Sequence, residues 1–556
     1  MKFKPLPVGV DNFEKMISEH YFYVDKTLLI KDIIDTKGEV TLCTRPRRFG
    51  KSLNISMLQY FFDKNKKKYA HIFDGLNITK IGGVYLTHQN SYPVIKITLK
   101  SADMGNFEDS FKQLKMEISE EFQRHNYLLK SESLSEQQKA FFIRIINLEA
   151  DIAVYARSLK FLSSCLELHH NKKVFILIDE YDVPLEKAYF QGYYEDMVNF
   201  IRGFFSNTLK TNDSLYKAIL TGCLRISKES IFTGVNNLKI VSILTNNFDE
   251  YFGFAEKEVV DALKYYGFGE KAKEAKEWYN GYLFGKSVVY NPWSIIQYLD
   301  GLCHKETRPK SFWANTSSNS IIKELVQNAD NDTKGEIESL MAGGTICKPI
   351  KEDIVYAEIM DTMDNLWSFL FFTGYLKKVS ERMDGVRTLI EMKIPNNEIA
   401  YIYDRFIYEW FQQRVKVNNY SVLYMAVIDG NAALFQKELS DILIKTISFM
   451  DSAESFYHGF LLGVLRPMEG YLIKSNREVG VGRSDIFIKP LTIRKRAIII
   501  ELKKAKTATE LYGMAKEGLQ QIYDKKYDIE LLEEGYVDIL RYGIAFYRKD
   551  CEIVVG

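Results

Sequence analysis

The stretch LCTRPRRFGKSLN, residues 42–54, decides how the first part of the chain is interpreted. A phosphate-binding loop follows the pattern G-x-x-x-x-G-K-[ST]. Its main-chain N–H groups must curl around phosphate oxygens while a lysine and a hydroxyl reach the outer phosphates and Mg²⁺. Gly50, Lys51 and Ser52 match the end of this pattern. Arg45 stands where the first glycine is expected, so the stretch predicts a nucleotide-binding loop that enters by a different backbone route.

The segments around this loop predict an α/β domain built on a parallel sheet. A short β-rich run precedes the loop at 39–46, and apolar residues at helical spacing follow it at 51–64. Strand, loop and helix in this order are the context that such a loop requires. The other runs that suit strands lie at 92–100, 172–182 and 216–223, and a helical passage lies at about 105–168. We therefore expect a doubly wound, mostly parallel sheet over roughly 20–245.

Acidic residues at the end of one buried run have the chemistry that nucleotide hydrolysis needs. The run VFILIDE contains Asp179, which can hold Mg²⁺ together with the hydroxyl of Ser52. Glu180 follows directly and can polarise an attacking water, as a general base does. The alternative is that both acids only end a strand and cap a helix.

Further candidates for nucleotide contact lie in the loop and at strand ends. Thr221 can sense the outer phosphate, and Arg225 can stabilise developing charge or form an ordinary surface salt bridge. The charges of the loop arginines can face phosphate or be solvated, and both interpretations stay open. The residues predicted to contact nucleotide from these patterns are Arg45, Arg47, Arg48, Phe49, Gly50, Lys51, Ser52, Leu53, Asp179, Thr221 and Arg225.

A second set of charged residues lies near the carboxyl end. GRSDIFIKP contains Asp485, and RAIIIELKKA contains Glu501 and Lys503. Side chains at positions i and i+2 of a strand point to the same face, so Glu501 and Lys503 are expected to converge. Two carboxylates can hold Mg²⁺ against a scissile phosphate while a lysine positions or deprotonates water. The pattern predicts a metal-dependent nuclease site, although a charged strand end can produce it without function.

Residues near this pattern extend the prediction. Glu454 on a preceding helix can add or orient a metal ligand, and Gln521 on a following helix can position phosphate or water. From Tyr471 to Lys506 there are ten Lys or Arg residues and three acids, an excess of seven. In a chain of net charge +1 this concentration suggests a surface for the phosphate backbone of nucleic acid. A solvated hairpin explains part of it equally well.

Several blocks occur in one order along nearly the whole chain. They are YFYVDKT, RPRRFGKS, LIDEYD, TGCLRISKESIFTGVNNL, WYNGY, YNPWSI, WANTSSNS, FFTGYL, KIPNNE, FYHGFLLGVL, SNREVGVGRSDI and IIIELKKA. Together they resemble the bacterial AAA-ATPase-like proteins that carry a PD-(D/E)XK nuclease-like domain at the carboxyl end. The resemblance implies ATP and Mg²⁺ as cofactors, Asp25 and Lys26 near the nucleotide pocket, and Arg45 as the family's own form of the loop. It also implies a nuclease site made of Asp485, Glu501 and Lys503, with Glu454 and Gln521 as accessory residues.

The expected fold class is α/β. It comprises a P-loop NTPase core with a doubly wound, mostly parallel sheet, a helical lid, a winged-helix-like middle module and a C-terminal PD-(D/E)XK nuclease-like α/β domain. The middle module is inferred from the order helix, hairpin, helix between 360 and 415. The expected boundaries are 1–245 for the AAA-ATPase-like domain, 246–345 for the lid, 346–440 for the winged-helix-like or helical linker module and 441–556 for the nuclease-like domain.

The composition excludes several classes of protein. Hydrophobic residues at 46% and charged residues at 26% are near globular averages, which argues against long disorder or a fibrous design. No segment approaches eighteen uninterrupted apolar residues, and the start has no continuous apolar stretch, so we expect neither membrane spanning nor secretion. Six scattered cysteines without a C-x-x-C pair suit a reducing cytoplasm.

Two functional hypotheses follow. In the first, the protein binds and hydrolyses ATP, and its nucleotide state regulates a metal-dependent nuclease, with DNA favoured over RNA as the partner. Defence against foreign DNA is compatible with this activity, and a homo-oligomer is left open. In the second, the protein is a nucleotide-gated switch or scaffold that binds nucleic acid or protein without cleavage.

Overall fold

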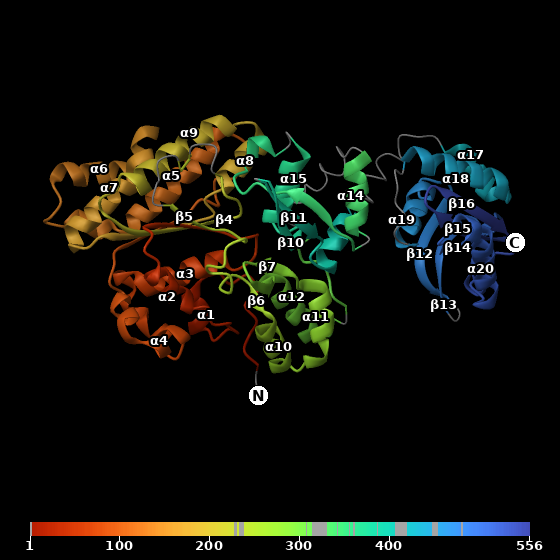
Figure 1. Cartoon of the computed structure of the whole chain (residues 1–556), viewed down its shortest axis with the longest axis horizontal. Coiled ribbons are helices and arrows are strands. Elements are labelled where there is room, and N and C mark those ends of the chain that lie inside the picture. The colour runs from red at the N-terminus through yellow and green to blue at the C-terminus, as the bar shows by residue number, and fades with distance from the viewer. Residues whose placement is uncertain are drawn as a thin grey trace. The chain divides into compact units, whose positions relative to one another are not determined.

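The structure is a computed structural model of the whole chain (Figure 1). It describes residues 3–226, 231–232, 238–306, 308–313, 331–341, 343–354, 356–359, 362–385, 387–405, 420–446, 454–479 and 482–556. The chain forms two compact units. Unit 1 comprises Met1–Trp313 and Cys347–Ile399, and unit 2 comprises Ala314–Ile346 and Ala400–Gly556. The four-part division expected from the sequence stays a prediction.

Unit 1 contains a five-stranded parallel sheet with the strand order β2-β3-β4-β1-β5. Its strands are β1 (Val40–Thr44), β2 (Val94–Thr98), β3 (Val174–Asp179), β4 (Leu215–Gly222) and β5 (Leu238–Val241). Every residue of β1 and β3 is buried, as expected for strands that are covered on both faces. The predicted parallel core is confirmed. The strand β5 at one edge was not predicted.

Helices cover both faces of this sheet (Figure 1). The helix α3 packs on β2 and β3 from one side, and α5 and α7 pack on the same two strands from the other. The first nine helices are α1 (Phe13–Ser18), α2 (Leu28–Asp35), α3 (Lys51–Phe62), α4 (Asn77–Ile81), α5 (Phe107–Arg124), α6 (Glu136–Ile146), α7 (Ile152–His170), α8 (Val183–Gln191) and α9 (Tyr194–Phe205).

A buried ion network holds β2 in place beside β3. Glu121 of α5 accepts a hydrogen bond from the main-chain N–H of Lys96 (2.8 Å) and pairs with Arg124 (2.6 Å). Arg124 also pairs with Asp63, which follows α3 (2.9 Å). Burial alone would raise the pKa of Glu121, but Arg124 and His125 together lower it to about 2. The network therefore favours the ionised carboxylate.

Replacing Glu121 with glutamine is expected to destabilise unit 1 in a pH-dependent way. The ordinary pKa is 4.5 and the folded value is about 2, so the carboxylate contributes roughly 3 kcal/mol to the free energy of unfolding at neutral pH. This contribution is complete above the ordinary pKa and is lost as the pH falls through the folded one. The difference between wild type and Glu121→Gln in urea unfolding should therefore shrink to roughly half at pH 3. Glu120→Gln, at an exposed neighbouring position, is the control, and a pH-independent difference for Glu121→Gln would contradict this interpretation.

The segment expected to form a helical lid contains helices and also a small sheet. The helices are α10 (Glu256–Tyr265), α11 (Ala272–Tyr279) and α12 (Pro292–Cys303). The antiparallel sheet has the order β6-β8-β7 and is made of β6 (Phe254–Ala255), β7 (Tyr282–Phe284) and β8 (Ser287–Tyr290). A two-residue turn joins β7 to β8, and its Gly285 has a φ of 52°, as tight hairpins require. The sequence prediction named only the helices.

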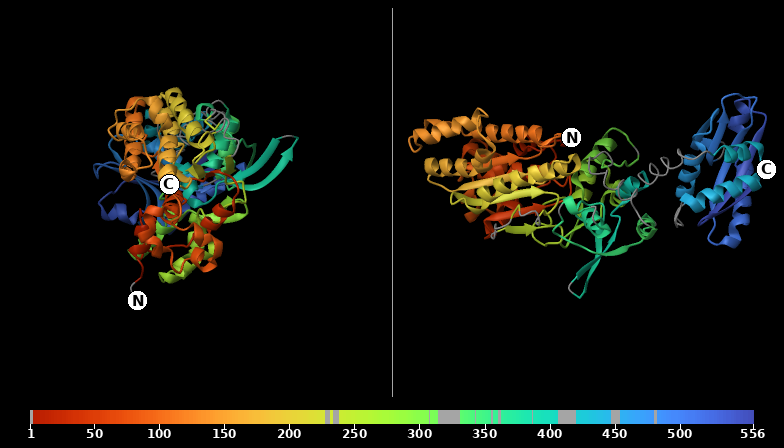
Figure 2. Two further views of the ribbon diagram at one scale, coloured as in Figure 1. Left: turned by 90° about the vertical axis from the view of Figure 1, so that its left-hand side faces the viewer. Right: turned by 90° about the horizontal axis from the view of Figure 1, so that it is seen from above.

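The middle segment has the predicted order of helix, hairpin and helix. The helix α15 (Met363–Phe372) precedes the strands β10 (Lys377–Asp384) and β11 (Arg387–Lys393), and residues 397–405 are helical. The hairpin belongs to a three-stranded sheet of order β10-β11-β9, with β9 at Ile346–Pro349. Figure 2 shows the hairpin extending away from the body of unit 1. The helix α14 (Asn331–Met341) lies before β9 in the chain.

Unit 2 contains a five-stranded mixed sheet of order β12-β13-β14-β15-β16. Only β14 and β15 are parallel, and α20 connects them. The strands are β12 (Tyr471–Val479), β13 (Gly482–Pro490), β14 (Ala497–Lys504), β15 (Ile539–Tyr547) and β16 (Asp550–Val555). The helices are α17 (Ser421–Asp429), α18 (Ala432–Thr446), α19 (Glu454–Leu465), α20 (Leu511–Asp524) and α21 (Ile529–Glu533). The predicted strands and following helix are confirmed up to α20, whereas β15 and β16 were not predicted.

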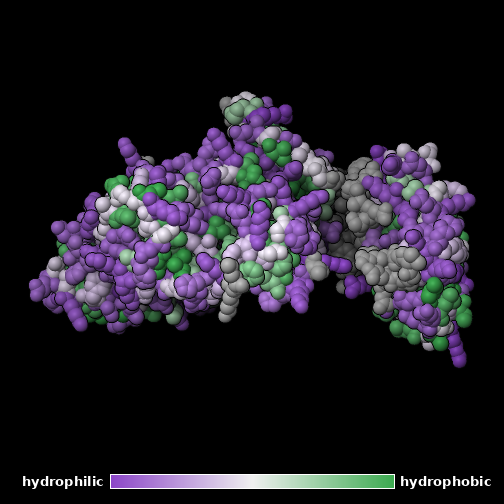
Figure 3. Space-filling view, turned by 90° about the horizontal axis from the view of Figure 1, so that it is seen from below, coloured by the Kyte–Doolittle hydropathy of each residue, from purple (hydrophilic) through white to green (hydrophobic). Residues whose placement is uncertain are grey.

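The described residues on one face of the molecule carry mainly polar side chains (Figure 3). The face drawn in Figure 3 is largely hydrophilic, with apolar residues in small scattered groups. Within the described ranges, none of the helices combines the length and the apolar character that crossing a membrane demands.

Candidate functional site

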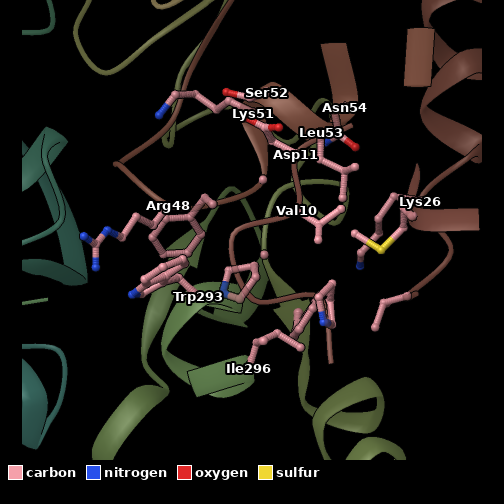
Figure 4. A pocket seen from close by; sticks show the side chains of 18 of the residues that line it. Val10, Asp11, Lys26, Arg48, Lys51, Ser52, Leu53, Asn54, Trp293 and Ile296 are labelled. Carbon is pink, nitrogen blue, oxygen red and sulfur yellow. The ribbon is translucent and has the colours of Figure 1, made fainter. Parts of the chain in front are cut away.

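A cavity of about 400 Å³ opens beside the first turn of α3 (Figure 4). Lys51 and Ser52 lie along one wall, and Trp293 and Ile296 of α12 lie along the opposite wall. A polar wall that faces an apolar one suits a ligand with a charged tail and a planar apolar group. The predicted nucleotide contacts that line the cavity are Lys26, Arg48, Phe49, Gly50, Lys51, Ser52 and Leu53.

The loop between β1 and α3 has the backbone that anion binding requires. Gly50 is the N-cap of α3 and has a φ of 81°, a left-handed conformation that glycine adopts without steric cost. Arg48 also lies in the left-handed region, with a φ of 67°. The first turn of a helix leaves its N–H groups without intrahelical acceptors, and the helix dipole attracts negative charge there. The start of the 12-residue helix α3 is therefore a place where phosphate can bind.

The ammonium group of Lys51 lies across this loop. Its Nζ donates to the main-chain carbonyl oxygens of Arg45 (3.0 Å) and Pro46 (2.9 Å). It also lies 3.7 Å from Sγ of Cys223. Lys51 is 6% exposed, so its charge is held inside the loop and next to the cavity.

Asp179 and Thr221 lie together at the carboxyl edge of the parallel sheet. Ile178 of β3 pairs with Leu220 of β4, which brings the next residue of each strand to the same edge. The hydroxyl of Thr221 donates to Oδ1 of Asp179. Neither Asp179 nor Thr221 is among the residues that line the cavity. In this structure its hydroxyl orients the predicted metal ligand, and its contact with the outer phosphate stays a prediction.

Glu180 lines the cavity together with the loop. Its φ is 52°, an uncommon backbone conformation for this residue type, and its N–H donates to Oδ1 of Asp179 (3.1 Å). Burial and the neighbouring Asp179 raise the pKa of Glu180. A raised pKa makes the carboxylate a stronger base, which suits the predicted general-base role.

Arg45 has a role that the sequence did not indicate. Its side chain is fully buried, and its guanidinium donates to the carbonyl oxygens of Thr44 (2.8 Å) and Val241 (2.9 Å). It also lies over the rings of Phe252 (5.3 Å) and Phe284 (5.2 Å). Burial lowers the pKa of Arg45 to about 10. The charge of Arg45 was expected either to face phosphate or to be solvated. Neither is observed, because Nη1 and Nη2 bind main-chain carbonyl oxygens inside the protein. Arg45 fastens the loop entry to the segment after β5.

Replacing Arg45 with alanine is expected to destabilise unit 1. It leaves the carbonyl oxygens that Arg45 binds without a donor, and a cavity remains between the rings of Phe252 and Phe284. The loss should be roughly 2 to 4 kcal/mol in the free energy of unfolding, measured by urea denaturation. Arg45→Lys should recover only part of it, because lysine lacks the planar fork. Wild-type stability combined with weaker nucleotide binding would show instead that the guanidinium serves phosphate.

The other predicted arginines contact protein groups in the structure. Arg47 pairs with the buried Glu186 (2.6 Å). Nη1 of Arg225 lies 4.0 Å from the Glu352 carboxylate, which fits the ordinary salt bridge that was the alternative for this residue. Neither Arg47 nor Arg225 is among the residues that line the cavity. Arg48 lines it and is considered further below.

The two residues that the resemblance placed near the pocket differ in position. The Asp25 carboxylate accepts hydrogen bonds from the N–H of Thr27 (2.9 Å) and the N–H of Asn77 (2.7 Å), and it does not line the cavity. Lys26 does line it, and its Nζ pairs with Glu258 of α10 at 2.7 Å. Asp25 therefore connects two segments of the fold, whereas Lys26 connects the cavity wall to α10.

Several cavity residues were not predicted from the sequence. Among them are Val10 in the N-terminal segment, Asn54 in α3, Lys100 after β2, and Trp293 and Ile296 in α12. The block YNPWSI contains Trp293 and was the only signal for this wall. Val10 and Lys100 come from segments far apart in the chain and carry no motif, whereas Asn54 ends the stretch 42–54 and Ile296 directly follows the block YNPWSI.

The second site lies on one face of the sheet in unit 2. Ile486 of β13 and Ile498 and Ile500 of β14 belong to the apolar core formed with α17, α18 and α19. Phe487 and Ile499 belong to a separate core on the opposite face. Strand alternation puts Asp485, Glu501 and Lys503 on this second face, beyond the apolar residues. The convergence expected from the i and i+2 spacing therefore agrees with the packing.

Gln521 of α20 joins these side chains. Nζ of Lys503 donates to Oε1 of Gln521 (2.7 Å) and lies 3.4 Å from Oε1 of Glu501. Nε2 of Gln521 donates to the same oxygen of Glu501. Asp485 accepts a hydrogen bond from the N–H of Leu502 (2.8 Å), which fixes its carboxylate beside β14. The four predicted residues thus form one polar cluster.

The donor set of this cluster fits a divalent metal ion. Burial, with a contribution from Asp485, raises the pKa of Glu501 to about 7. The buried Oε2 of Glu501 has no hydrogen-bond partner among the described residues. Carboxylate oxygens are the ligands that Mg²⁺ and Mn²⁺ prefer. The cluster offers two carboxylates to such an ion. In the described part of the chain, no three or more His, Cys, Asp or Glu side chains are grouped so that they could hold one together. Glu454 begins α19, but its side chain lies outside the described residues.

The basic segment around this cluster is partly neutralised. The buried Lys489 pairs with Glu530 of α21 (2.6 Å) and with Glu534, which follows α21 directly (2.8 Å). Arg496 pairs with Asp538 (3.0 Å). The local excess of positive charge counted along the sequence therefore overstates the charge that a nucleic acid would meet.

Comparison with known proteins gives two family matches. Residues 7–232 match a family model described as a predicted AAA-ATPase, and residues 452–555 match a model of the PD-(D/E)XK nuclease superfamily. An "Uncharacterized protein in vnfD 5'region" of Azotobacter chroococcum mcd 1 is 25% identical over 402 residues. The matched region covers 72% of this chain and 69% of that protein. The first family match contains the loop and its acids, and the second contains the polar cluster of unit 2.

Proposed function

This chain combines an AAA-ATPase-like domain with a domain of the PD-(D/E)XK nuclease superfamily, and on that premise we propose that its nucleotide state regulates metal-dependent cleavage of nucleic acid. The first domain binds and hydrolyses ATP, and the second cleaves a phosphodiester bond, with DNA favoured over RNA. Defence against foreign DNA and a homo-oligomeric state stay predictions.

In the first domain the loop binds the triphosphate. The N–H groups at the start of α3 and the ammonium of Lys51 hold the phosphate oxygens, while Ser52 and Asp179 would share the Mg²⁺ that accompanies ATP. Thr221 keeps Asp179 oriented through its hydroxyl. Glu180 accepts a proton from the attacking water, which its raised pKa favours.

In the second domain Asp485 and Glu501 would hold the divalent metal ion. Such an ion supplies Lewis-acid stabilisation of the phosphate charge and lowers the pKa of a bound water. Lys503 lies beside the carboxylates and positions the attacking water or the scissile phosphate. The amide of Gln521 binds both Lys503 and Glu501, so it fixes the positions of these two side chains relative to each other.

The observation that carries the nuclease half of the proposal is the polar cluster itself. Buried charged groups cost stability unless they are paired or bind a ligand. Here one oxygen of Glu501 is buried without a partner among the described residues, next to a second carboxylate. A bound cation would give that oxygen its partner.

The direct test incubates the full chain with DNA and RNA in the presence of Mg²⁺ or Mn²⁺. We expect cleavage that stops on chelation and whose rate changes when ATP is added. The second candidate function, the switch or scaffold, is favoured by the small number of metal ligands in the described residues. Retention of nucleic acid that depends on ATP, without cleavage under any condition, would establish that candidate and reject the nuclease.

A further inference from the structure

Phe312 joins the nucleotide loop to a buried acid far along the chain. Its main-chain carbonyl accepts a hydrogen bond from Nη1 of Arg48 (2.9 Å). Its main-chain N–H donates to Oε1 of Glu398 (2.8 Å). A single residue thus connects a side chain of the loop to a carboxylate in the middle segment.

Arg48 is placed to respond to a ligand in the cavity. It lines the cavity, and its guanidinium lies 4.6 Å from the ring centre of Trp293, which lines the cavity beside it (Figure 4). Its left-handed backbone sits between β1 and Gly50. If the loop closes around a phosphate, Arg48 must move relative to Phe312 and Trp293. The contacts that Arg48 makes with these two residues oppose that movement.

The buried carboxylate of Glu398 is stabilised by the hydrogen bonds that it accepts. Its side chain is fully buried, and it accepts from the N–H groups of Phe312 (2.8 Å) and Trp313 (3.0 Å) and from the hydroxyl of Ser294 (2.8 Å). Burial raises the pKa of Glu398 to about 7, and these hydrogen bonds oppose the rise. A buried carboxylate is costly without donors, so a displacement of Phe312 changes the free energy of this whole contact.

Glu398 also lies where the chain leaves unit 1. It is near the start of helix 397–405, and unit 1 ends at Ile399. A second contact joins the loop to the same segment, because Pro46 packs against Gly374. A Cβ atom at Gly374 would lie 3.1 Å from Cβ of Pro46 and 2.9 Å from the ring of Trp313. The loop therefore touches the middle segment directly at Gly374, between α15 and the hairpin, and reaches Glu398, after the hairpin, through Phe312.

We propose that Glu398 is a positioning residue for the nucleotide loop. Its carboxylate fixes the position of Phe312, and Phe312 in turn fixes the side chain of Arg48. A nucleotide that shifts Arg48 therefore changes the stability of helix 397–405. This inference rests on the proposed binding of ATP. It names the residues through which nucleotide binding affects helix 397–405. Because coupling is reciprocal, a change at Glu398 must alter nucleotide affinity.

A double-mutant cycle tests the connection. Calorimetric titration of the full chain with the Mg²⁺ complex of a non-hydrolysable ATP analogue gives the dissociation constants. Arg48→Ala and Glu398→Ala should each weaken binding by about tenfold, and the double variant should also lose only about tenfold, because both act through Phe312. Glu398→Gln, which keeps an acceptor oxygen, should bind as wild type does. A loss of about a hundredfold in the double variant, or wild-type affinity for Glu398→Ala, would overturn the inference.

Hydrogen exchange supplies a readout that does not need Glu398→Ala to fold. In wild type, the analogue should slow exchange in peptides from 309–313 and 397–405. In Arg48→Ala at saturating analogue, the change at 397–405 should be absent. Exposed Glu381→Ala on β10 serves as the control and should respond as wild type. Calorimetric binding without any exchange change at 397–405 would overturn the inference and leave the proposed function intact. Absence of binding by wild type would reject both.

Discussion

Replacement of Lys503 with alanine is expected to lower metal-dependent cleavage of nucleic acid by about 10²- to 10⁴-fold. The ammonium of Lys503 is the cationic group in the polar cluster, 2.7 Å from Gln521 and 3.4 Å from Glu501. Without it, the attacking water and the scissile phosphate lose the ammonium that positions them, and only the metal ion that Asp485 and Glu501 would hold remains to offset the developing charge. Single-turnover cleavage of labelled DNA at saturating metal measures the loss.

The neighbouring Lys504 provides the matched control. It follows Lys503 on β14, and strand alternation directs its side chain to the opposite face. Lys504→Ala should keep the wild-type rate, and both variants should bind DNA with similar affinity. Equal cleavage by Lys503→Ala and wild type would reject the nuclease assignment of this cluster.

The second large effect is expected at Glu180. Replacing it with glutamine should lower ATP hydrolysis by about 10²- to 10⁴-fold, because the amide cannot accept the proton of the attacking water. Nucleotide affinity should change little, since Lys51 and the N–H groups of α3 remain. Phosphate release at saturating ATP measures the rate, and calorimetry with the intact variant measures affinity.

Glu195→Gln is the control for this prediction, because Glu195 is exposed on α9 and lies outside the cavity. Its hydrolysis rate should equal that of wild type. If Glu180→Gln hydrolyses ATP at the wild-type rate, the carboxylate is not the base. If it loses binding as well, Glu180 serves the nucleotide in its ground state.

The sequence predicts much of the fold because its signals there are local. The apolar runs at β1, β3 and β4 are uniform enough to indicate buried strands, and the order strand, loop, helix identifies the context of Lys51. The short edge strand β5 and the last two strands of unit 2 were missed. β5 has only four residues, and β15 mixes buried and half-buried positions, so neither shows a regular period.

The candidate sites were predictable where spacing determines geometry. Glu501 and Lys503 converge because they are two positions apart on one strand. Arg45 could not be understood in this way, because apart from the adjacent Thr44 its partners are carbonyl oxygens far along the chain, such as that of Val241, which is 196 positions away. Glu398 was likewise only part of a sequence block. Its importance arises from a tertiary contact with Phe312, which no local pattern encodes.

The measurement that tests the account most directly is a calorimetric titration of the full chain with the Mg²⁺ complex of a non-hydrolysable ATP analogue. The account predicts saturable binding by wild type and affinity at least about tenfold weaker for Lys51→Ala, since a charge-assisted hydrogen bond to phosphate is lost. Lys80→Ala, at a surface position on α4, should bind as wild type does. No heat of binding for wild type, or equal affinity for Lys51→Ala, would contradict the central claim that this loop holds a nucleoside triphosphate.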